Sequence, residues 1–347
     1  MVEKQSLLIR ADADVRIGSG HVMRCLALAQ GWIESGGVVY FASAILPDGL
    51  ANRLVTEGLH LCRLDVGAGS PADAQAAAEL AREIKADWLV VDGYHFGYEY
   101  QLSIKEHGLR LLVIDDYGHA GRYVADLILN QNVYATVDLY PYRAGETKLL
   151  LGVEYALLRR EFWDWQGWER PISTTPNKLL VTLGGGDANN VTLRVIQAIQ
   201  RLEDISLEVV IIVGGSNPHL AALQNAVRND SRLQLVHNVD NMPELMAWAD
   251  GAVSAAGSTC WELAFMGLPA LLIILADNQR PIAEELDKTG ICVNLGWFDK
   301  LTNQQIRTGL YNLMADEKQR LRMSVSGKKL VDGLGTQRVI RLLNRYD

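Results

Sequence analysis

Ile17-Gly18-Ser19-Gly20-His21-Val22-Met23-Arg24 connects the apolar run Leu7-Leu8-Ile9 to a segment in which apolar residues recur at helical spacing. The recurring residues are Val22, Leu26, Ala29 and Ile33. This pattern predicts a strand, a glycine turn and a helix, with His21 in the first helical turn beside the positive end of the helix dipole. We expect Gly18 and Gly20 to adopt backbone conformations that other residues avoid and to let a substrate approach the main chain. These are the features of a loop that binds an anionic ligand.

This loop does not complete a dinucleotide-binding fingerprint. Met23 stands at the third glycine position of G-x-G-x-x-G, and the predicted strand Val38–Ala42 ends without an acidic residue for a ribose. An alternative for His21 is a helix-start residue bonded to a nearby carbonyl. The glycine turn, together with the second half of the chain, favours the ligand-facing interpretation.

Composition limits the classes of protein to consider. A chain of 347 residues fits two domains of ordinary size, and 49% hydrophobic with 21% charged residues is typical of a globular protein. The net charge of −8 argues against a nucleic-acid partner. The longest apolar run, 268–276, is too short to span a bilayer and the N-terminus lacks a signal pattern, so we expect a cytoplasmic protein with no membrane partner.

The sequence predicts neither a metal site nor a cofactor. Asp12 and Asp14 lie near a strand end without a third ligand at recognisable spacing. The cysteines are widely spaced and form no C-x-x-C pair, so we expect them to pack as small hydrophobic residues in a reducing compartment: Cys25, Cys62, Cys260 and Cys292.

Strand-like and helix-like segments alternate along the chain, which predicts an α/β protein with largely parallel sheets. The expected architecture is two Rossmann-like domains facing across a cleft. We predict an N-terminal domain at 1–165, a linker at 166–177, a second domain at 178–318 and a C-terminal helical stretch at 319–347 that packs back on the first domain. The predicted strands are 6–10, 38–42, 59–64, 88–92, 111–115, 127–129, 148–151, 178–183, 207–213, 233–236, 251–254, 270–275 and 291–295.

Parallel sheets place ligand loops at the carboxyl ends of their strands. In the first half this edge is predicted to hold a group of polar residues, namely Asp12, His21, Asp92, Tyr94, Asp115 and Asp116. In the second half it begins with the turn Gly184-Gly185-Gly186-Asp187, which follows a strand as the first glycine turn does.

Ala255 to Pro269 is predicted to be a glycine turn that enters a short helix. Free amides at Ser258, Thr259 and Cys260, with the helix dipole, would hold a diphosphate without a metal. The alternative is a capping box, in which Glu262 bonds back to the Thr259 amide. Because Gly20, Gly185 and Gly257 all mark turns at strand ends, we favour a convergent anion site.

Two further polar stretches follow strands. Asn278 and Gln279 come directly after the strand 270–275 and are predicted to face the ligand, the alternative for Asn278 being a helix N-cap. Asn238 and Val239 lie where a planar base could be held by main-chain bonds. The P-loop, the G-x-S-x-G nucleophile elbow and H-E-x-x-H are absent, so the sequence supports neither a P-loop enzyme nor a serine hydrolase.

Taken together, these motifs resemble those of the UDP-sugar hydrolases of pseudaminic acid biosynthesis, which remove UDP from UDP-2,4-diacetamido-2,4,6-trideoxy-β-L-altropyranose. The resemblance lies in the motifs Arg10-Ala11-Asp12 with Ile17 to Leu26, Val90-Val91-Asp92-x-Tyr94, Val113-Ile114-Asp115-Asp116, Leu151 to Arg159, and Ala256 through Gln279. A more distant likeness is to MurG-type glycosyltransferases, which implies the GT-B fold.

The resemblance implies a role for each matching residue. His21 is the expected general base, while Tyr94 and Asn278 match positions that line the sugar site. Glu262 is expected at the ribose hydroxyls, with the remaining positions at the uracil and the diphosphate: Asn238, Val239, Gly257, Ser258 and Thr259.

The implied reaction is attack of water at C1 with inversion, which releases UDP as a good leaving group. The UDP-sugar is the expected partner, and a monomer is expected. Two alternatives stay open at this point. One is a glycosyltransferase that uses a UDP-sugar donor, and the other is a non-catalytic nucleotide-sugar-binding protein.

Overall fold

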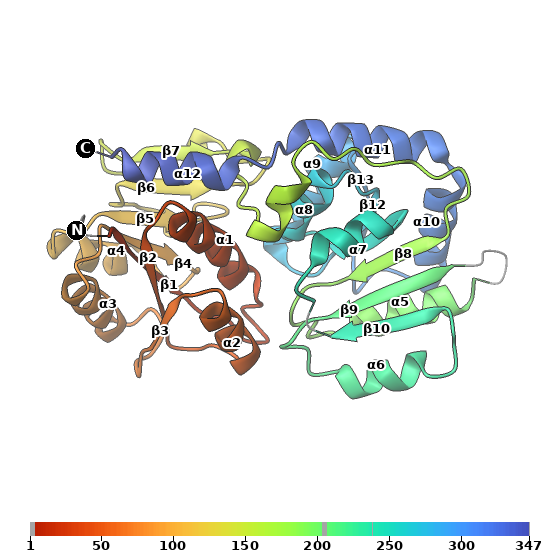
Figure 1. Ribbon diagram of the computed structural model, residues 1–347, viewed down its shortest axis with the longest axis horizontal. Helices are drawn as coiled ribbons and strands as arrows, with labels where there is room; N and C mark the ends of the chain where they lie inside the picture. Colours follow the sequence, from red (N-terminus) through yellow and green to blue (C-terminus); the bar gives the residue numbers. More distant parts are fainter. Residues whose placement is uncertain (1–3, 203–206, 238, 347) are drawn as a thin grey trace. The chain divides into compact units, whose positions relative to one another are not determined.

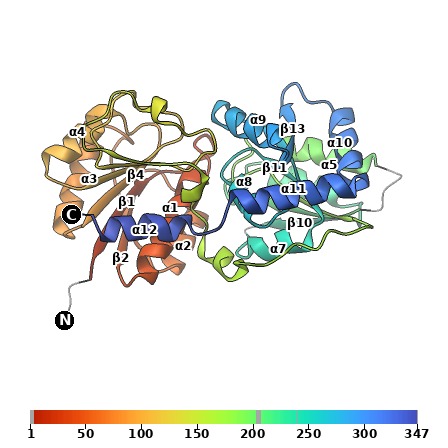
Figure 2. The same cartoon turned by 90° about the horizontal axis from the view of Figure 1, so that it is seen from above.

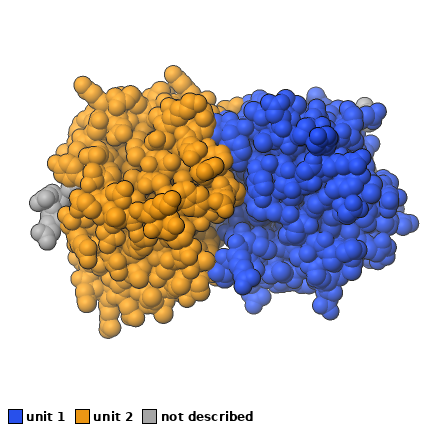
Figure 3. Space-filling model, turned by 180° about the vertical axis from the view of Figure 1, so that it is seen from behind, with its two compact units in different colours: residues 1–160, 333–347 blue, residues 161–332 orange. Residues whose placement is uncertain are grey.

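The computed structural model describes residues 4–202, 207–237 and 239–346. The chain forms two compact units, one made of residues 1–160 with 333–347 and the other of residues 161–332 (Figure 3). Each unit is built on one parallel sheet with helices packed against it (Figure 1).

The sheet of the first unit has the strand order β3-β2-β1-β4-β5-β6-β7, and all of its pairings are parallel. Its strands are β1 Ser6–Ala11, β2 Val38–Ser43, β3 His60–Arg63, β4 Trp88–Asp92, β5 Leu111–Ile114, β6 Leu127–Asn130 and β7 Lys148–Leu151. The central strands β4 and β5 are buried along their whole length because both faces of the sheet are covered.

Two groups of helices cover this sheet. Helices α1 Gly20–Glu34, α2 Asp48–Thr56 and α12 Gly335–Asn344 share one apolar core with the strands, whereas α3 Pro71–Glu83 and α4 Tyr98–Glu106 share a second core. The 3-10 turns η1 Val137–Leu139, η2 Val153–Tyr155 and η3 Arg160–Trp165 lie in the loops that follow β6 and β7.

The sheet of the second unit has the order β10-β9-β8-β11-β12-β13, again with parallel pairings throughout. Its strands are β8 Lys178–Thr182, β9 Glu208–Val213, β10 Leu233–His237, β11 Gly251–Ala255, β12 Ala270–Ile274 and β13 Cys292–Trp297. Its helices are α5 Val191–Gln200, α6 Leu220–Val227, α7 Met242–Trp248, α8 Thr259–Phe265, α9 Arg280–Lys288, α10 Asn303–Ala315 and α11 Glu317–Leu330, with the 3-10 turn η4 Asp277–Gln279.

Both sheets start in the middle and grow first toward one edge and then toward the other. The order therefore reverses between β1 and β4 in the first unit and between β8 and β11 in the second. In open parallel sheets, the crevice for a ligand lies outside the carboxyl ends of the strands at this switch point. The fold alone thus marks one position in each unit as a candidate site.

All the strands predicted from the sequence are present, with ends that differ by at most two residues. The boundaries of the two units differ more from the predicted domain boundaries. The chain passes between units after Arg160, so 166–177 belongs to the second unit rather than forming a linker. Arg170 explains this difference, because its guanidinium donates to the carbonyls of Met246, Ala249 and Met266.

The C-terminal stretch predicted as one helical segment contains two separate helices, α11 and α12 (Figure 2). Gly333, with φ of +78°, lies in the break between them. Helix α12 belongs to the first unit, where the Trp88 indole donates to the Leu343 carbonyl at 3.1 Å.

Gly335, the first residue of α12, packs directly on backbone, and we expect Gly335→Ala to destabilise the protein. A Cβ atom there would lie 2.2 Å from the Ala156 carbonyl oxygen, so the helix must shift. Overpacking of this kind costs about 1–3 kcal/mol. The control is Gly49→Ala in α2, where a Cβ meets nothing within 4 Å. Thermal unfolding followed by circular dichroism should show a lower Tm for the first variant only, and equal Tm values would contradict the packing argument.

Candidate active site

His21 lies at the switch point of the first unit and is paired with Asp92. His21 is the second residue of α1, which follows β1, and Asp92 is the last residue of β4. The His21 Nδ1 atom lies 2.6 Å from Asp92 Oδ1. The predicted placement of His21 in the first helical turn is therefore confirmed. Gly18 has φ of +77° as expected, but Gly20 belongs to the helix and has no positive φ, so only one glycine supplies the turn.

Arg24 binds two carboxylates beside His21. Its Nε and Nη2 atoms donate to Asp92 at 2.6 and 2.7 Å, and its Nη1 atom donates to Asp116 Oδ1 at 2.7 Å. Residues three apart on a helix share one face, which explains why Arg24 and His21 reach the same acid. Arg24 thereby ties α1 to the carboxyl ends of β4 and β5.

Asp116 joins the site to an aromatic residue. Its Oδ2 atom accepts from the Tyr94 hydroxyl at 2.7 Å, and its Oδ1 atom accepts from Asn132 Nδ2 at 2.8 Å. The Tyr94 ring lies edge-on to His21, with 5.0 Å between the ring centroids. The structure thus brings together His21 and Tyr94, two residues predicted to share a site.

The charges in this cluster keep both carboxylates ionised. Burial raises the pKa of Asp92, but the charge of Arg24 and the hydrogen bonds from Arg24 and His21 outweigh it and hold the pKa below its ordinary value. The pKa of Asp116 is likewise lowered, because burial is outweighed by Arg24. Burial and the Asp116 charge raise the pKa of Tyr94, so its phenol stays protonated as a donor.

An ionised Asp92 fixes the tautomer of His21. A carboxylate beside Nδ1 accepts that proton and leaves Nε2 as the acceptor nitrogen of the ring. The His21 side chain is 10% exposed, and among the described residues its Nε2 makes no hydrogen bond. An aspartate-oriented imidazole with an available nitrogen is the arrangement of a general base.

Asp12, predicted to bind substrate, is instead enclosed within the first unit. Its side chain is fully buried and forms an ion pair with Arg10 at 2.7 Å. Its Oδ1 atom also accepts from Ser43 Oγ and from the amides of Ala44 and Ile45. The carboxylate therefore holds the loop between β2 and α2 and presents no oxygen to a ligand.

In the second unit, the predicted glycine turns follow β8 and β11, the two strands at the switch point. Gly185 packs against Gly214, which follows β9. A Cβ on Gly214 would lie 2.5 Å from the Cα of Gly185. Asp187, at the end of the same turn, accepts from the amides of Val191 and Thr192 at 2.8 and 2.9 Å and so begins α5.

The turn at Gly257 differs from the prediction in two details. Helix α8 begins at Thr259, and Ser258 rather than Thr259 is its N-cap, without a hydrogen bond from the Ser258 side chain. The Cys260 amide donates to the Gly257 carbonyl at 3.0 Å and is not free. The Ser258 and Thr259 amides make no backbone hydrogen bond among the described residues.

The predicted residues after β12 and β10 occupy the same edge. Gln279 accepts from the Leu275 amide at 2.9 Å and is the N-cap of α9, so Asn278 is not that cap. The Gln279 side chain also lies close to the turn at Gly257, because a Cβ on Gly257 would lie 3.8 Å from Gln279 Nε2. Val239 is half-buried after β10, and Asn238 lies outside the described residues.

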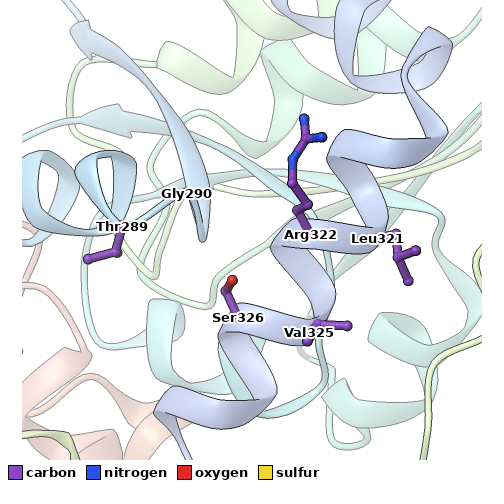
Figure 4. Close-up of a pocket in the computed structure, with 6 residues that line it drawn as sticks. All are labelled: Thr289, Gly290, Leu321, Arg322, Val325 and Ser326. Atoms are coloured by element: carbon purple, nitrogen blue, oxygen red, sulfur yellow. The ribbon is translucent and has the colours of Figure 1, made fainter.

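A pocket of about 320 Å³ lies elsewhere in the second unit (Figure 4). It lies between α11 and the turn that enters β13, and its lining residues are Thr289, Gly290, Leu321, Arg322, Val325 and Ser326. Thr289 and Gly290 precede β13, so this pocket is at the amino ends of the strands, opposite to the predicted ligand edge.

Metal ligands and membrane-spanning helices bear on the chemistry open to this site. Across residues 4–202, 207–237 and 239–346, no group of three or more His, Cys, Asp or Glu side chains is arranged to hold a metal ion. Within the same residues, no helix combines the length and the apolar character needed to cross a bilayer. The four cysteines are all unpaired.

Comparison with known proteins adds to this geometry. Residues 178–334 match the family model for the glycosyltransferase family 28 C-terminal domain. The chain is 24% identical to the spore coat polysaccharide biosynthesis protein SpsG of Bacillus subtilis over 340 residues, which cover 96% of each chain. It is 26% identical over 289 residues to the UDP-2,4-diacetamido-2,4,6-trideoxy-beta-L-altropyranose hydrolase of Campylobacter jejuni, covering 82% of this chain and 97% of that one.

Among solved structures, MurG of Acinetobacter baumannii superimposes with a TM-score of 0.66 and 19% identity, covering 99% of this chain and 100% of that one. The protein has the GT-B fold. In this GT-B protein, the family 28 match covers β8 to α11, which includes every predicted residue of the second unit.

Sequence reasoning did not identify Arg24 and Asn132 as members of the site. Arg24 lies within the opening motif, three residues after His21, and this spacing was the available signal. Asn132 follows β6, where the pattern contains no sign of its contact with Asp116.

Arg24→Met should destabilise the protein by about 3–5 kcal/mol, because it leaves two buried carboxylates without their cation. The pKa values of Asp92 and Asp116 are lowered in the folded protein, so their contribution is present above pH of about 3.9 and is lost as the pH falls. In the variant, burial without the Arg24 charge raises both pKa values, so the sign reverses and stability falls as the pH rises above about 3.9.

Urea unfolding between pH 4 and 8 measures this effect. Arg280→Met is the control, because its contact with Glu284 spans 3.8 Å between side chains 59% and 61% exposed. That substitution should change stability by less than about 0.5 kcal/mol. Equal stability of the two variants would show that Arg24 does not hold the cluster together.

Proposed function

We propose that this protein is a metal-independent UDP-sugar hydrolase that releases a 2,4-diacetamido-2,4,6-trideoxyhexose from its UDP-activated form. One observation carries the proposal, namely that Asp92 holds Nδ1 of His21 at the switch point and leaves Nε2 available. The similarity to the Campylobacter jejuni hydrolase supports the choice of substrate, and the family 28 match of the second unit supports a nucleotide-sugar donor.

In this proposal, His21 Nε2 accepts a proton from water as the oxygen attacks C1 of the sugar. The bond between C1 and the diphosphate oxygen breaks, and UDP leaves with its electron pair. Attack from the face opposite the leaving group inverts C1. Asp92 stabilises the imidazolium that forms, and general-base catalysis of this kind contributes roughly 10²–10⁴-fold.

The second unit is proposed to bind UDP. The Ser258 and Thr259 amides at the start of α8 are directed to the diphosphate, with Gly185 and Gly257 allowing close approach. Glu262 is assigned to the ribose hydroxyls and Val239 to the uracil. Asn278 and Gln279 are assigned to the sugar with Tyr94, and the charge on UDP is taken up by amides instead of a metal ion.

A glycosyltransferase is the second candidate, favoured by the likeness to MurG and by the family 28 match. Both reactions start from a UDP-sugar and differ in the nucleophile. Incubation of the protein with the UDP-altropyranose substrate alone, followed by proton NMR, separates them. Stoichiometric free sugar of inverted configuration supports the hydrolase, and turnover that appears only after an acceptor hydroxyl is added supports the transferase. Tight UDP binding without any turnover would indicate a binding protein.

His21→Ala and Asp92→Asn should both lower kcat on the order of 10²–10⁴-fold while the Kd of UDP changes less than about twofold. The first removes the base, and the second removes the charge that fixes its tautomer. UDP release and calorimetric titration with UDP measure the two quantities. His60→Ala is the matched control, because His60 is an exposed residue of β3. Near-wild-type turnover of His21→Ala would remove His21 from the mechanism.

Glu262→Gln should raise the Kd of UDP by about tenfold, because a carboxylate that accepts from a ribose hydroxyl makes a charge-assisted hydrogen bond. The Kd of 2′-deoxyuridine diphosphate should rise much less, since that ligand lacks one of the hydroxyls. Glu284→Gln on α9, with a side chain 61% exposed, is the control. If both nucleotides lose affinity equally, Glu262 does not contact the ribose.

A further inference from the structure

Two exposed tyrosines lie side by side at the carboxyl edge of the first sheet. Tyr94 is 36% exposed and follows β4, while Tyr117 is 44% exposed and follows the neighbouring strand β5. Their ring centroids are 5.1 Å apart, with 50° between the ring planes. We call this pair the tyrosine wall. Large apolar side chains exposed together at a ligand edge are a common feature of binding sites.

The tyrosine wall is held in place from within the protein. His119, whose side chain is 4% exposed, contacts both rings, with centroids 5.6 Å from Tyr94 and 6.3 Å from Tyr117. His119 is itself fixed by Asp115, whose Oδ1 atom lies 3.0 Å from Nδ1. Because the supporting imidazole is buried and anchored, the rings are ordered before any ligand arrives, which lowers the entropy cost of binding.

The two tyrosines offer different surfaces. The Tyr94 hydroxyl is bonded to Asp116, so its polar end points into the charged cluster. The Tyr117 hydroxyl makes no hydrogen bond to the described residues, so this side chain offers mainly its ring. The Tyr94 ring also lies 5.0 Å from His21, which places the wall next to the proposed base.

We propose that Tyr117 is a specificity-determining residue that, with Tyr94, packs against methyl groups of the sugar and selects deoxygenated, N-acetylated sugars over hydroxylated ones. This inference rests on the proposed function and deepens it. A 2,4-diacetamido-2,4,6-trideoxyhexose carries three methyl groups where an ordinary hexose carries hydroxyls. An aromatic face gains from contact with methyl groups and would leave a hydroxyl without a hydrogen-bond partner.

Tyr117→Ala tests the inference, with Tyr117→Phe as the conservative variant. Tyr117→Ala should raise the KM for the UDP-trideoxyhexose about tenfold, because one aromatic contact is lost, and should leave kcat within about threefold. Tyr117→Phe should match the wild type. UDP-N-acetylglucosamine, whose C4 and C6 carry hydroxyls, serves as a competitive inhibitor, and its inhibition constant should change less than about twofold.

Tyr142→Ala is the matched control, because Tyr142 is 70% exposed in the loop between β6 and β7. This substitution should leave KM, kcat and the inhibition constant unchanged. An unchanged KM in Tyr117→Ala overturns the inference, and so does an equal rise in KM and in the inhibition constant. Absence of hydrolysis by the wild type would instead refute the proposed function. A Tm equal to that of the wild type shows that Tyr117→Ala remains folded.

Discussion

The contact on which the candidate site depends is the pairing of one guanidinium with two carboxylates. Arg24 joins α1 to the ends of β4 and β5, and Asp92 then holds His21 at 2.6 Å. The two acids outnumber the cation by one charge, so the cluster is negative while the imidazole is neutral. In the proposed reaction, the proton that His21 gains would restore neutrality in a buried environment. The same ion pairs that assemble the strand ends thus favour the charge that a general base acquires.

The position of this cluster follows from topology. Both sheets begin in the middle and reverse direction once, so each opens a crevice at a single point on its carboxyl edge. His21 and Asp92 flank that point in the first sheet, as the turns at Gly185 and Gly257 do in the second. The two units place different groups at this switch point. The first places titratable side chains there, whereas the second places glycines and main-chain amides, which suits it to an anionic group.

The sequence predicted the strands, the glycine turn and His21 because each is encoded by neighbouring residues. Pairings across long separations could not be predicted in this way. Arg24 meets Asp92 and Asp116 across 68 and 92 residues, and no local pattern records such contacts. Asp12 was predicted as a ligand residue because it follows a strand. Asp12 instead forms a buried ion pair with Arg10, two residues earlier, and Arg10 also donates to Asp73.

Four carboxylates lie at the carboxyl edge of the first sheet, and their partners show which are structural and which face the candidate site. Asp12 pairs with Arg10 and holds the loop after β2 through Ser43 and the Ala44 and Ile45 amides. Asp115 binds His119 and Tyr123. Asp92 and Asp116 share Arg24 and face His21 and Tyr94. Of the two imidazoles beside Tyr94, that of His119 is the more enclosed, and its Nε2 is buried without a partner among the described residues. His21 is therefore the imidazole that we propose as the base, while the acids and the second histidine hold it and the adjacent aromatic rings in position.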